Sequence, residues 1–188
     1  MQIKKEDIRN SILIAAERLF IKRGYENTSL KMIADICNIS KSNIYRYFGS
    51  KEEIYETIVG PAREAITGKA PYFFSQEIIN KSVAEKCEEV PLILSALMSR
   101  FHSEILIMLK SENGTDRRML EKLITDSFIN SCPIEKNGSK ELISGMLVFG
   151  LTEILMKYSG EKDLLREIRS LIRYHYLGLN GLKEEIHI

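Results

Sequence analysis

The stretch SLKMIADICNISKSNIYRYF, residues 29–48, decides the fold of this chain. Its pattern predicts two short helices, each preceded by a serine that can cap it, Ser29 and Ser40. Between the helices, Asn38 is one of the few non-glycine residues that tolerate the positive φ of a sharp turn. Ile39 is predicted to fill the angle between the two helices. The stretch therefore predicts a helix-turn-helix.

The second helix of this pair has an unusual outward face. Ile44 and Phe48 are expected to anchor it from within. Its outward side chains can all donate hydrogen bonds and none is acidic: Lys41, Ser42, Asn43, Tyr45 and Arg46. A short polar helix on a small apolar core is the form that enters the major groove of DNA. The alternative is a helical hairpin with an ordinary solvated face.

The residues on either side extend the helical pattern. An apolar stripe from Ile8 to Phe20 at helical spacing predicts a first helix that ends at Gly24. Ser50-Lys51-Glu52-Glu53 has the form of a capping box, so a fourth helix is expected to start there. Gly60-Pro61 is expected to kink or break that helix, because proline removes a helical hydrogen bond. Residues 68–75 then read as a connection.

The remainder of the chain also favours helices. The expected ranges are 76–87, 91–110 with Pro91 in the first turn, 116–131, 139–159 and 162–179. The fold class is thus all-α, with about nine helices in all. A three-helix head over residues 1–50 contains the helix-turn-helix of residues 29–48, residues 51–67 form a connecting helix, and residues 68–188 form a larger helical body for effector binding and dimerisation.

Charge is distributed unevenly along the 188 residues. Residues 1–55 hold ten basic and seven acidic side chains, and the rest of the chain holds 17 and 19. A basic head on a mildly acidic body fits a DNA-facing end.

Other classes of protein find little support. The three scattered cysteines, Cys37, Cys87 and Cys132, form no metal-binding pattern and read as reduced thiols, so neither a metal nor a cofactor is expected. No apolar run approaches the ~18 residues of a membrane span, and the charged N-terminus does not resemble a signal peptide. Motifs typical of enzymes are missing. We expect a cytoplasmic protein that is not an enzyme.

Residues 8–58 contain a series of short motifs at fixed spacing: Ile12-Leu13-Ile14-Ala15-Ala16-Glu17-Arg18-Leu19-Phe20, Gly24-Tyr25, Thr28-Ser29, Ile33-Ala34, Ser40-Lys41, Tyr45-Arg46-Tyr47-Phe48 and Ser50-Lys51-Glu52. Through these motifs the head resembles the TetR family of bacterial transcriptional regulators. Two positions depart from the family, which usually has glycine where this chain has Asn38 and Ser42.

The resemblance implies a role for each matching position in contact with operator DNA. Ser29 and Ser40 can present donors to phosphates at helix N-termini. Tyr47 and Lys51 are expected to clamp the DNA backbone. Contacts with base edges or flanking phosphates are expected from Lys41, Ser42, Asn43, Tyr45 and Arg46.

The resemblance also implies a homodimer formed by the last two helices of each subunit. Both helices carry broad apolar faces, around Leu147 and around Ile168, and Gly145 and Gly150 would let helices approach closely. The alternative is that these faces pack only within one subunit. Dimerisation is favoured because a twofold operator requires two reading heads.

The segment Leu92–Leu109 is apolar on most sides and is expected to form a central buried helix. Within it, His102 reads either as a pocket residue that holds a polar group of a ligand or as a hydrogen-bonded core histidine. Five further side chains read either as the lining of a cavity or as ordinary core residues: Phe73, Phe74, Met119, Phe128 and Phe149. The candidate pocket residues are Met98, Phe101, His102, Ile105 and Phe128.

Two hypotheses of function remain. The first is a repressor released from a palindromic operator by a small apolar or amphipathic ligand. The second is a DNA-binding protein that is controlled by a protein partner, or an architectural DNA binder without a small ligand. A closed apolar cavity in the body would favour the first, and a solid core with an exposed apolar patch the second.

Overall fold

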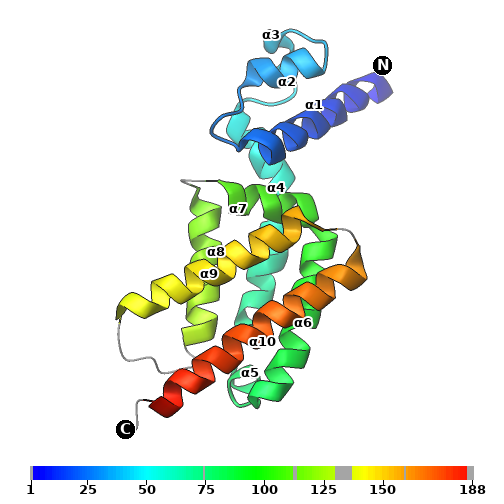
Figure 1. Cartoon of the computed structure of the whole chain (residues 1–188). Coiled ribbons are helices and arrows are strands. Elements are labelled where there is room, and N and C mark those ends of the chain that lie inside the picture. Colours follow the sequence, from blue (N-terminus) through cyan, green and yellow to red (C-terminus); the bar gives the residue numbers. More distant parts are fainter. Residues whose placement is uncertain (1, 74, 112–113, 130–136, 159, 186–188) are drawn as a thin grey trace. The chain divides into compact units, whose positions relative to one another are not determined.

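The computed structural model describes residues 2–73, 75–111, 114–129, 137–158 and 160–185, with only the backbone at some helical positions. Within these ranges the chain forms ten helices and no strand (Figure 1). The helices are α1 Gln2–Arg23, α2 Leu30–Ile36, α3 Lys41–Ile44, α4 Lys51–Phe73, α5 Gln76–Ile79, α6 Val83–Arg100, α7 His102–Lys110, α8 Thr115–Ile129, α9 Asn137–Met156 and α10 Glu161–Glu185. The all-helical fold class predicted from the sequence is confirmed.

The helices divide into two compact units. The first unit contains Met1–Glu64 and Ser103–Arg117, and the second contains Ala65–His102 and Arg118–Ile188. The chain therefore passes between the units three times, and one of these passages lies inside α4. Placement of most of α7 in the same unit as α1–α3 was not expected from the sequence.

The first unit has the core that its sequence pattern predicts. The apolar stripe of α1 is buried, as are Ile33 and Ala34 of α2 and Ile54 and Val59 of α4. Gly24 ends α1 with a φ of +81°, where a residue with a Cβ would be strained. α7 adds five consecutive buried residues to this unit, from Ile105 to Leu109.

The break expected at Gly60-Pro61 and the helix start expected at Pro91 are wrong, whereas a kink at Gly60-Pro61 stays a prediction. α4 is helical through Gly60 and Pro61 and continues to Phe73, so residues 68–73 are not a connection. Pro91 lies inside α6 rather than at the start of a helix. The expected helix over residues 91–110 is instead divided at Phe101, the C-cap of α6, so Leu92–Leu109 is not one central helix.

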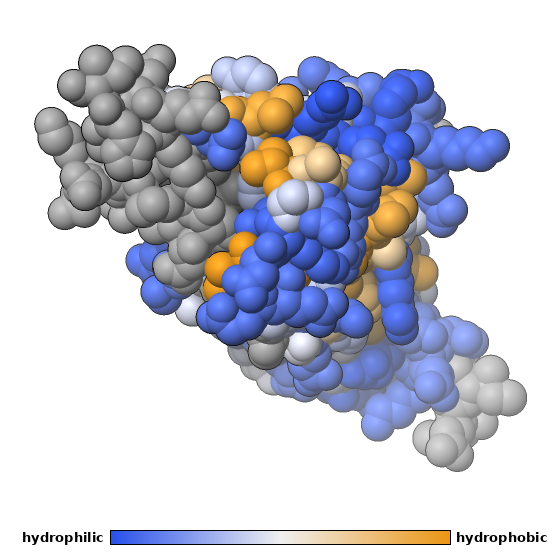
Figure 2. Space-filling view, turned by 90° about the horizontal axis from the view of Figure 1, so that it is seen from below, coloured by the Kyte–Doolittle hydropathy of each residue, from blue (hydrophilic) through white to orange (hydrophobic). Residues whose placement is uncertain are grey.

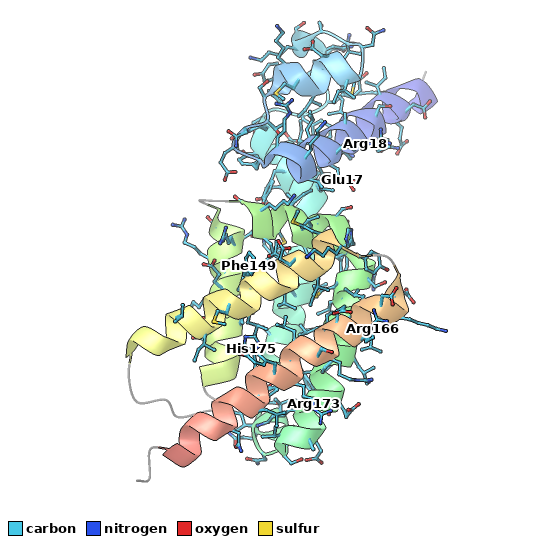
Figure 3. The ribbon with its side chains drawn as sticks, in the orientation of Figure 1. Glu17, Arg18, Phe149, Arg166, Arg173 and His175 are labelled. Carbon is cyan, nitrogen blue, oxygen red and sulfur yellow. The ribbon has the colours of Figure 1, made fainter. Side chains whose placement is uncertain are left out.

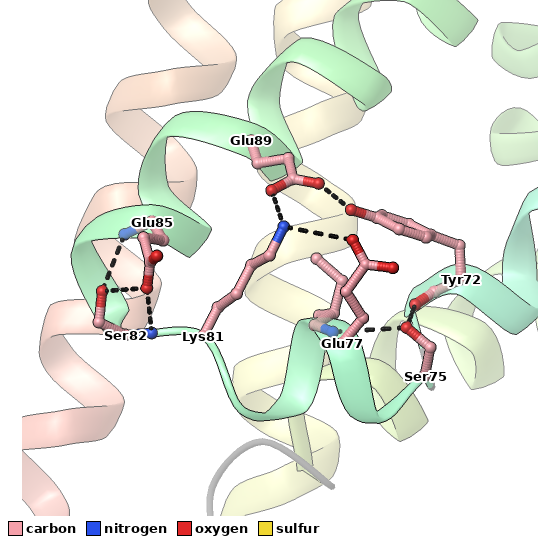
Figure 4. A network of polar contacts seen from close by, with 8 residues as sticks. Tyr72, Ser75, Glu77, Lys81, Ser82, Glu85 and Glu89 are labelled. Atoms are coloured by element: carbon pink, nitrogen blue, oxygen red, sulfur yellow. Dashed lines mark hydrogen bonds and ion pairs between the residues drawn. The ribbon is translucent and has the colours of Figure 1, made fainter.

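Polar contacts fix the helix starts of the second unit. Ser82 and Glu85 form a complete capping box at the start of α6: the Ser82 hydroxyl accepts from the Glu85 N–H, and the Glu85 carboxylate accepts from the Ser82 N–H (Figure 4). Lys81 pairs with Glu89, which also accepts a hydrogen bond from the Tyr72 hydroxyl. These contacts tie the end of α4 to α6.

α9 carries two apolar stripes. Leu147, Leu151 and Leu155 are buried, and α10 packs against α6 and α9. Gly150 gives room for this packing, because a Cβ there would lie 2.9 Å from the methyl groups of Leu171 on α10, which would have to shift. A second stripe, at the spacing of one helix face, is exposed: Leu142, Met146, Phe149 and Met156. We call it the α9 outer stripe.

The exposed position of Phe149 corrects its assignment as a cavity or core residue. Its exposed fraction is 68%, and Figure 3 labels it on α9, with Arg166, Arg173 and His175 on α10. Figure 2 shows one face of the molecule, on which orange hydrophobic patches lie among blue hydrophilic residues.

No single helix of the described ranges is long and apolar enough to cross a membrane. Only α6 and α7 taken together, across their break, have the length and composition of such a span.

Candidate nucleic-acid interface

The turn between α2 and α3 has the geometry that the sequence predicts. Asn38 has a φ of +53°, the one positive φ of a non-glycine residue among those the structure describes. The Ile39 N–H donates to the Ala34 carbonyl at 3.0 Å, and the Asn38 N–H donates to the Asp35 carbonyl at 3.2 Å. These two bonds are those of a Schellman motif, so the end of α2 satisfies its own carbonyls.

α3 is a short helix fixed at both ends. Its N-cap is Ser40, whose hydroxyl accepts from the Asn43 N–H at 3.2 Å and lies 2.9 Å from the Ser42 hydroxyl. Ile44 and Phe48 are 0% and 1% exposed, which confirms them as the anchors. The apolar contacts of two side chains therefore hold a helix that is too short to be stable alone.

The predicted contact residues lie together on the first unit. Ser29 is the N-cap of α2, and its hydroxyl accepts from the Met32 N–H at 3.3 Å. Asn43 and Tyr47 are half-buried. The remaining members on α3 and its flanks are exposed: Ser40, Lys41, Ser42, Tyr45 and Arg46. This surface presents hydroxyl, amide, ammonium and guanidinium donors, and no carboxylate interrupts residues 38–48.

Lys51 differs from the other members because its ammonium is already occupied within the protein. Its Nζ donates to the Tyr25 and Thr28 carbonyls, both at 2.8 Å, and lies 4.1 Å from the centroid of the Tyr25 ring. The Tyr25 hydroxyl in turn donates to the Glu52 carboxylate at 2.8 Å. Burial, followed by this hydrogen bond to a carboxylate, raises the pKa of Tyr25, which keeps it a donor.

The start of α4 also departs slightly from the predicted capping box. The Ser50 hydroxyl accepts from the Glu53 N–H at 3.1 Å, as expected. The Glu53 carboxylate, however, accepts from the Gly49 N–H at 2.6 Å, one residue earlier than in the standard motif.

An ionic cluster around the buried Asp116 in the first unit was missed from the sequence. Arg63 donates from Nε and one terminal nitrogen to the two oxygens of Asp116, at 2.6 and 2.7 Å, and it also pairs with Glu56. The Tyr55 hydroxyl donates to Asp116 at 2.8 Å. Arg63 and Asp116 are 53 positions apart, so no local pattern could have paired them.

The pKa of Asp116 reflects two opposing causes. Burial disfavours its charged form, but the hydrogen bonds from Arg63 and Tyr55 outweigh burial and lower the pKa below the usual value. The pKa of Tyr55 is raised, first by burial and then by its hydrogen bond to Asp116. The cluster therefore stays ionised at neutral pH.

α7 also makes two polar contacts to the residues at the end of α1. Lys110 Nζ donates to the Ile21 carbonyl at 2.9 Å, and the buried Ser111 hydroxyl donates to the Glu26 carboxylate at 2.7 Å. The loop between α1 and α2, Gly24–Ser29, is thus held by α4 on the one hand and by the end of α7 on the other.

The predicted pocket residues are not brought together into one described cavity. Ile105 belongs to the first unit, whereas Met98, Phe101 and His102 belong to the second, and the side chain of Phe128 lies outside the described residues. His102 Nε2 is 2.9 Å from the Leu155 carbonyl, which accepts its hydrogen bond, and its ring lies 4.9 Å from that of Tyr158. The pocket therefore remains a prediction.

Among the described residues, no cluster of histidine, cysteine, aspartate and glutamate has the geometry of a metal site. The thiols of Cys37 and Cys87 both have a raised pKa because of burial, which disfavours the reactive thiolate. Cys132 lies outside the described residues.

Two short helices, joined at a positive-φ turn and presenting an exposed polar face on α3, define the class of helix-turn-helix proteins. Residues 12–58 match the family model described as "Bacterial regulatory proteins, tetR family". The similarity to this family thus covers about a quarter of the chain, its N-terminal helix-turn-helix segment.

Two curated relatives and one solved structure illustrate the extent of the similarity. The transcriptional repressor BepR of Brucella suis is 37% identical over 57 residues, which are 30% of this chain and 27% of the relative. The transcriptional activator FasR of Mycolicibacterium smegmatis is 34% identical over 58 residues, 31% and 26% of the two chains. The matches thus span about a quarter of these relatives.

The whole fold is also similar to that of a TetR-family regulator from Bordetella parapertussis. The TM-score is 0.60 at 18% identity, over 93% of this chain and 98% of the other. At this identity the match concerns the fold alone, so the two chains share an all-helical fold.

Proposed function

We propose that this protein is a sequence-specific DNA-binding transcriptional regulator that reads a palindromic operator as a homodimer. The observation that carries the proposal is the exposed donor face of α3, held by the buried Ile44 and Phe48 within the segment that matches the TetR family. Nucleic acid is the complementary ligand, because phosphates and base edges offer the acceptors that these side chains need.

Contacts with DNA divide by chemistry. Ser29, Ser40 and Tyr47 are assigned to the sugar–phosphate backbone, as hydroxyl donors that fix the register. Five side chains are assigned to contacts with base edges or adjacent phosphates: Lys41, Ser42, Asn43, Tyr45 and Arg46. Among these, asparagine pairs well with adenine and arginine with guanine.

Support for a homodimer comes from the α9 outer stripe. An exposed set of large apolar side chains on one helix face is typical of an interaction site. A Cβ at Gly145, which lies on the same face, would meet nothing within 4 Å, so a neighbouring helix can approach there. α10 adds the exposed Tyr174 and Leu177. Pairing of α9 and α10 with their copies would cover these surfaces and supply two reading heads.

Control by a small apolar or amphipathic ligand that releases the operator is the finer part of the proposal. Its support is the half-buried His102, whose ring contacts the Leu155 carbonyl of α9 and the Tyr158 ring within the second unit. The test is mass spectrometry of molecules released from the purified protein, followed by DNA binding in their presence. A released apolar compound that weakens DNA binding supports a ligand; its absence, with an unchanged affinity across apolar ligands, favours control by a protein partner.

DNA recognition itself is tested by selecting sequences from a random pool with the full-length protein. We expect enrichment of a twofold-related site whose half-sites lie one helical turn, ~34–36 Å, or a multiple of it apart. Binding should weaken steeply with salt. Selection that enriches no twofold site at any salt concentration would falsify the proposal.

A further inference from the structure

The ammonium of Lys51, the first residue of α4, lies against the loop between α1 and α2. It is 2.8 Å from the Tyr25 carbonyl, 2.8 Å from the Thr28 carbonyl and 4.1 Å from the centroid of the Tyr25 ring. A lysine ammonium has three N–H donors. Two of them are used on carbonyls, and the aromatic face adds a cation–π contact to the same charge. A bond from Lys51 to a phosphate would compete with these contacts.

The two carbonyls lie at the two ends of a tight turn. The Thr28 N–H donates to the Tyr25 carbonyl at 3.2 Å, and the Thr28 hydroxyl donates to the Gly24 carbonyl at 2.8 Å. Lys51 therefore bridges the start and the end of the turn. Its neighbour Glu52 accepts the hydrogen bond from the Tyr25 hydroxyl, so consecutive residues of α4 hold both the backbone and the side chain of this loop.

The loop leads directly into the DNA-reading helices. Ser29 follows Thr28 and caps α2. α2 packs against α3, and its C-terminal turn is fixed by the bonds of Ile39 and Asn38. A displacement of the Tyr25–Thr28 turn would therefore move the Ser29 cap and, through α2, the donor face of α3.

We propose that Lys51 is a positioning residue of the reading head, which fixes the Tyr25–Thr28 turn and thereby the Ser29 cap of α2, instead of contacting a DNA phosphate. The inference rests on the proposed DNA-binding function. It assigns to Lys51 a role different from the phosphate clamp that the family resemblance implies.

The experiment compares Lys51→Met with Lys41→Met in the full-length protein on the selected operator. Both variants keep an unbranched side chain of similar length and lose one charge. Lys41 is an exposed lysine of α3 that has no hydrogen bond or ion pair among the described residues. DNA affinity is measured across salt concentrations at a temperature well below unfolding, with circular dichroism to confirm that each variant is folded, and the thermal midpoint is measured separately.

Lys51→Met should weaken DNA binding on the order of tenfold while the slope of log affinity against log salt stays that of the wild type. Its thermal midpoint should fall by about 5 °C. Lys41→Met should instead reduce the salt slope by about one and leave the thermal midpoint unchanged. A residue that only stabilises the fold would weaken DNA binding only by lowering the fraction of folded protein. Weaker binding by a fully folded Lys51→Met protein would therefore exclude a purely structural role.

A second variant reaches the same turn without changing any charge. Tyr25→Phe removes the hydrogen bond to Glu52, and it should also weaken DNA binding with an unchanged salt slope. It stands in for Lys51→Met should that variant fail to fold.

Three results would overturn the inference alone: a salt slope reduced by about one in Lys51→Met, an affinity equal to that of the wild type in Lys51→Met, or no effect of Tyr25→Phe. Failure of the wild type to bind any selected site would instead overturn the proposed function, and the inference with it.

Discussion

Asp116 holds its negative charge in a position that is 5% exposed. Removal of one partner from a buried ion pair leaves the other charge buried and unpaired. This lowers the free energy of unfolding by more than the intact pair contributes to it. Arg63 keeps a second carboxylate partner in Glu56, but Asp116 depends on Arg63 and Tyr55. The cluster joins α4 to the start of α8 within the first unit, so its loss should loosen the packing between these two helices.

Asp116→Asn should lower the free energy of unfolding at neutral pH by about 3 kcal/mol. This is the low end of the values expected when one partner of a buried ion pair is removed, because the Arg63 side chain is 28% exposed. The lowered pKa of Asp116 means that the unfolded state binds more protons, so this stability is present above the unfolded pKa of about 4. It is lost as the pH falls through the lower, folded pKa. Urea unfolding at a series of pH values checks this.

The wild type and Asp116→Asn should therefore differ most above about pH 5 and converge below about pH 4. A difference that does not change across this range would mean that the charge of Asp116 contributes nothing to stability.

Arg46 is exposed and free to reach a base edge. Arg46→Ala should cost roughly 1–3 kcal/mol on the preferred operator and relax the choice of base at one position of each half-site. Affinities for operators with every base at each position measure this. An equal loss on all sequences would make Arg46 a backbone contact, as would a salt slope reduced by about one with no change in preference.

At the scale of helices, prediction succeeded where capping and turn residues act locally. Ser29, Ser40, Gly24 and Asn38 all do what their chemistry predicts, and Ile44 and Phe48 are buried as the spacing requires. In each case the residues that determine the conformation are within a few positions of one another.

Prediction failed where a local signal was overlooked and where the sequence holds no local signal. Pro91 does not start a helix, because the capping box of Ser82 and Glu85 starts α6 at Val83, eight residues earlier; that local signal was overlooked. Nothing local marks the end of α6 at Phe101, since neither glycine nor proline stands there. The exposure of Phe149 could not be predicted either. α9 has two apolar stripes, and the sequence does not show which of them packs inside the subunit.

α4 offers a prediction at this scale. Gly60 lies within the helix, and a Cβ there would meet nothing within 4 Å. Gly60→Ala should therefore raise the free energy of unfolding by about 1 kcal/mol, because alanine loses less backbone entropy in a helix. Denaturant unfolding measures the change. A destabilised variant would show that α4 needs a conformation at Gly60 that alanine resists.

The same helix passes from the first unit to the second between Glu64 and Ala65. We propose that Gly60-Pro61 is a hinge that couples effector binding to the spacing of the two heads of a dimer; a continuous helix can still bend at this point. Gly60→Ala with Pro61→Ala should then reduce the effect of an effector on DNA affinity. An effector that releases DNA from this variant by the same factor would exclude the hinge.

At the scale of the whole molecule, a dimer is required for a palindromic site. Phe149→Glu should raise the dissociation constant of the dimer at least ~100-fold, since each copy would lose ~1.5–3 kcal/mol of apolar burial. Sedimentation velocity over a range of concentrations measures this, with Phe149→Leu as the control that keeps an apolar side chain. Because Phe149 is 68% exposed in one subunit, a dimer of unchanged affinity would place the interface elsewhere.

The central claim is that the exposed face of α3 reads DNA sequence. The direct measurement is the affinity of the triple variant Lys41→Ala, Asn43→Ala and Arg46→Ala for the operator selected by the wild type, set against a random duplex at the same salt. The account predicts that the variant stays folded, because Ile44 and Phe48 still anchor α3, and that its preference for the operator falls to nearly that for random DNA. A folded variant that still prefers the operator as strongly as the wild type would contradict the account.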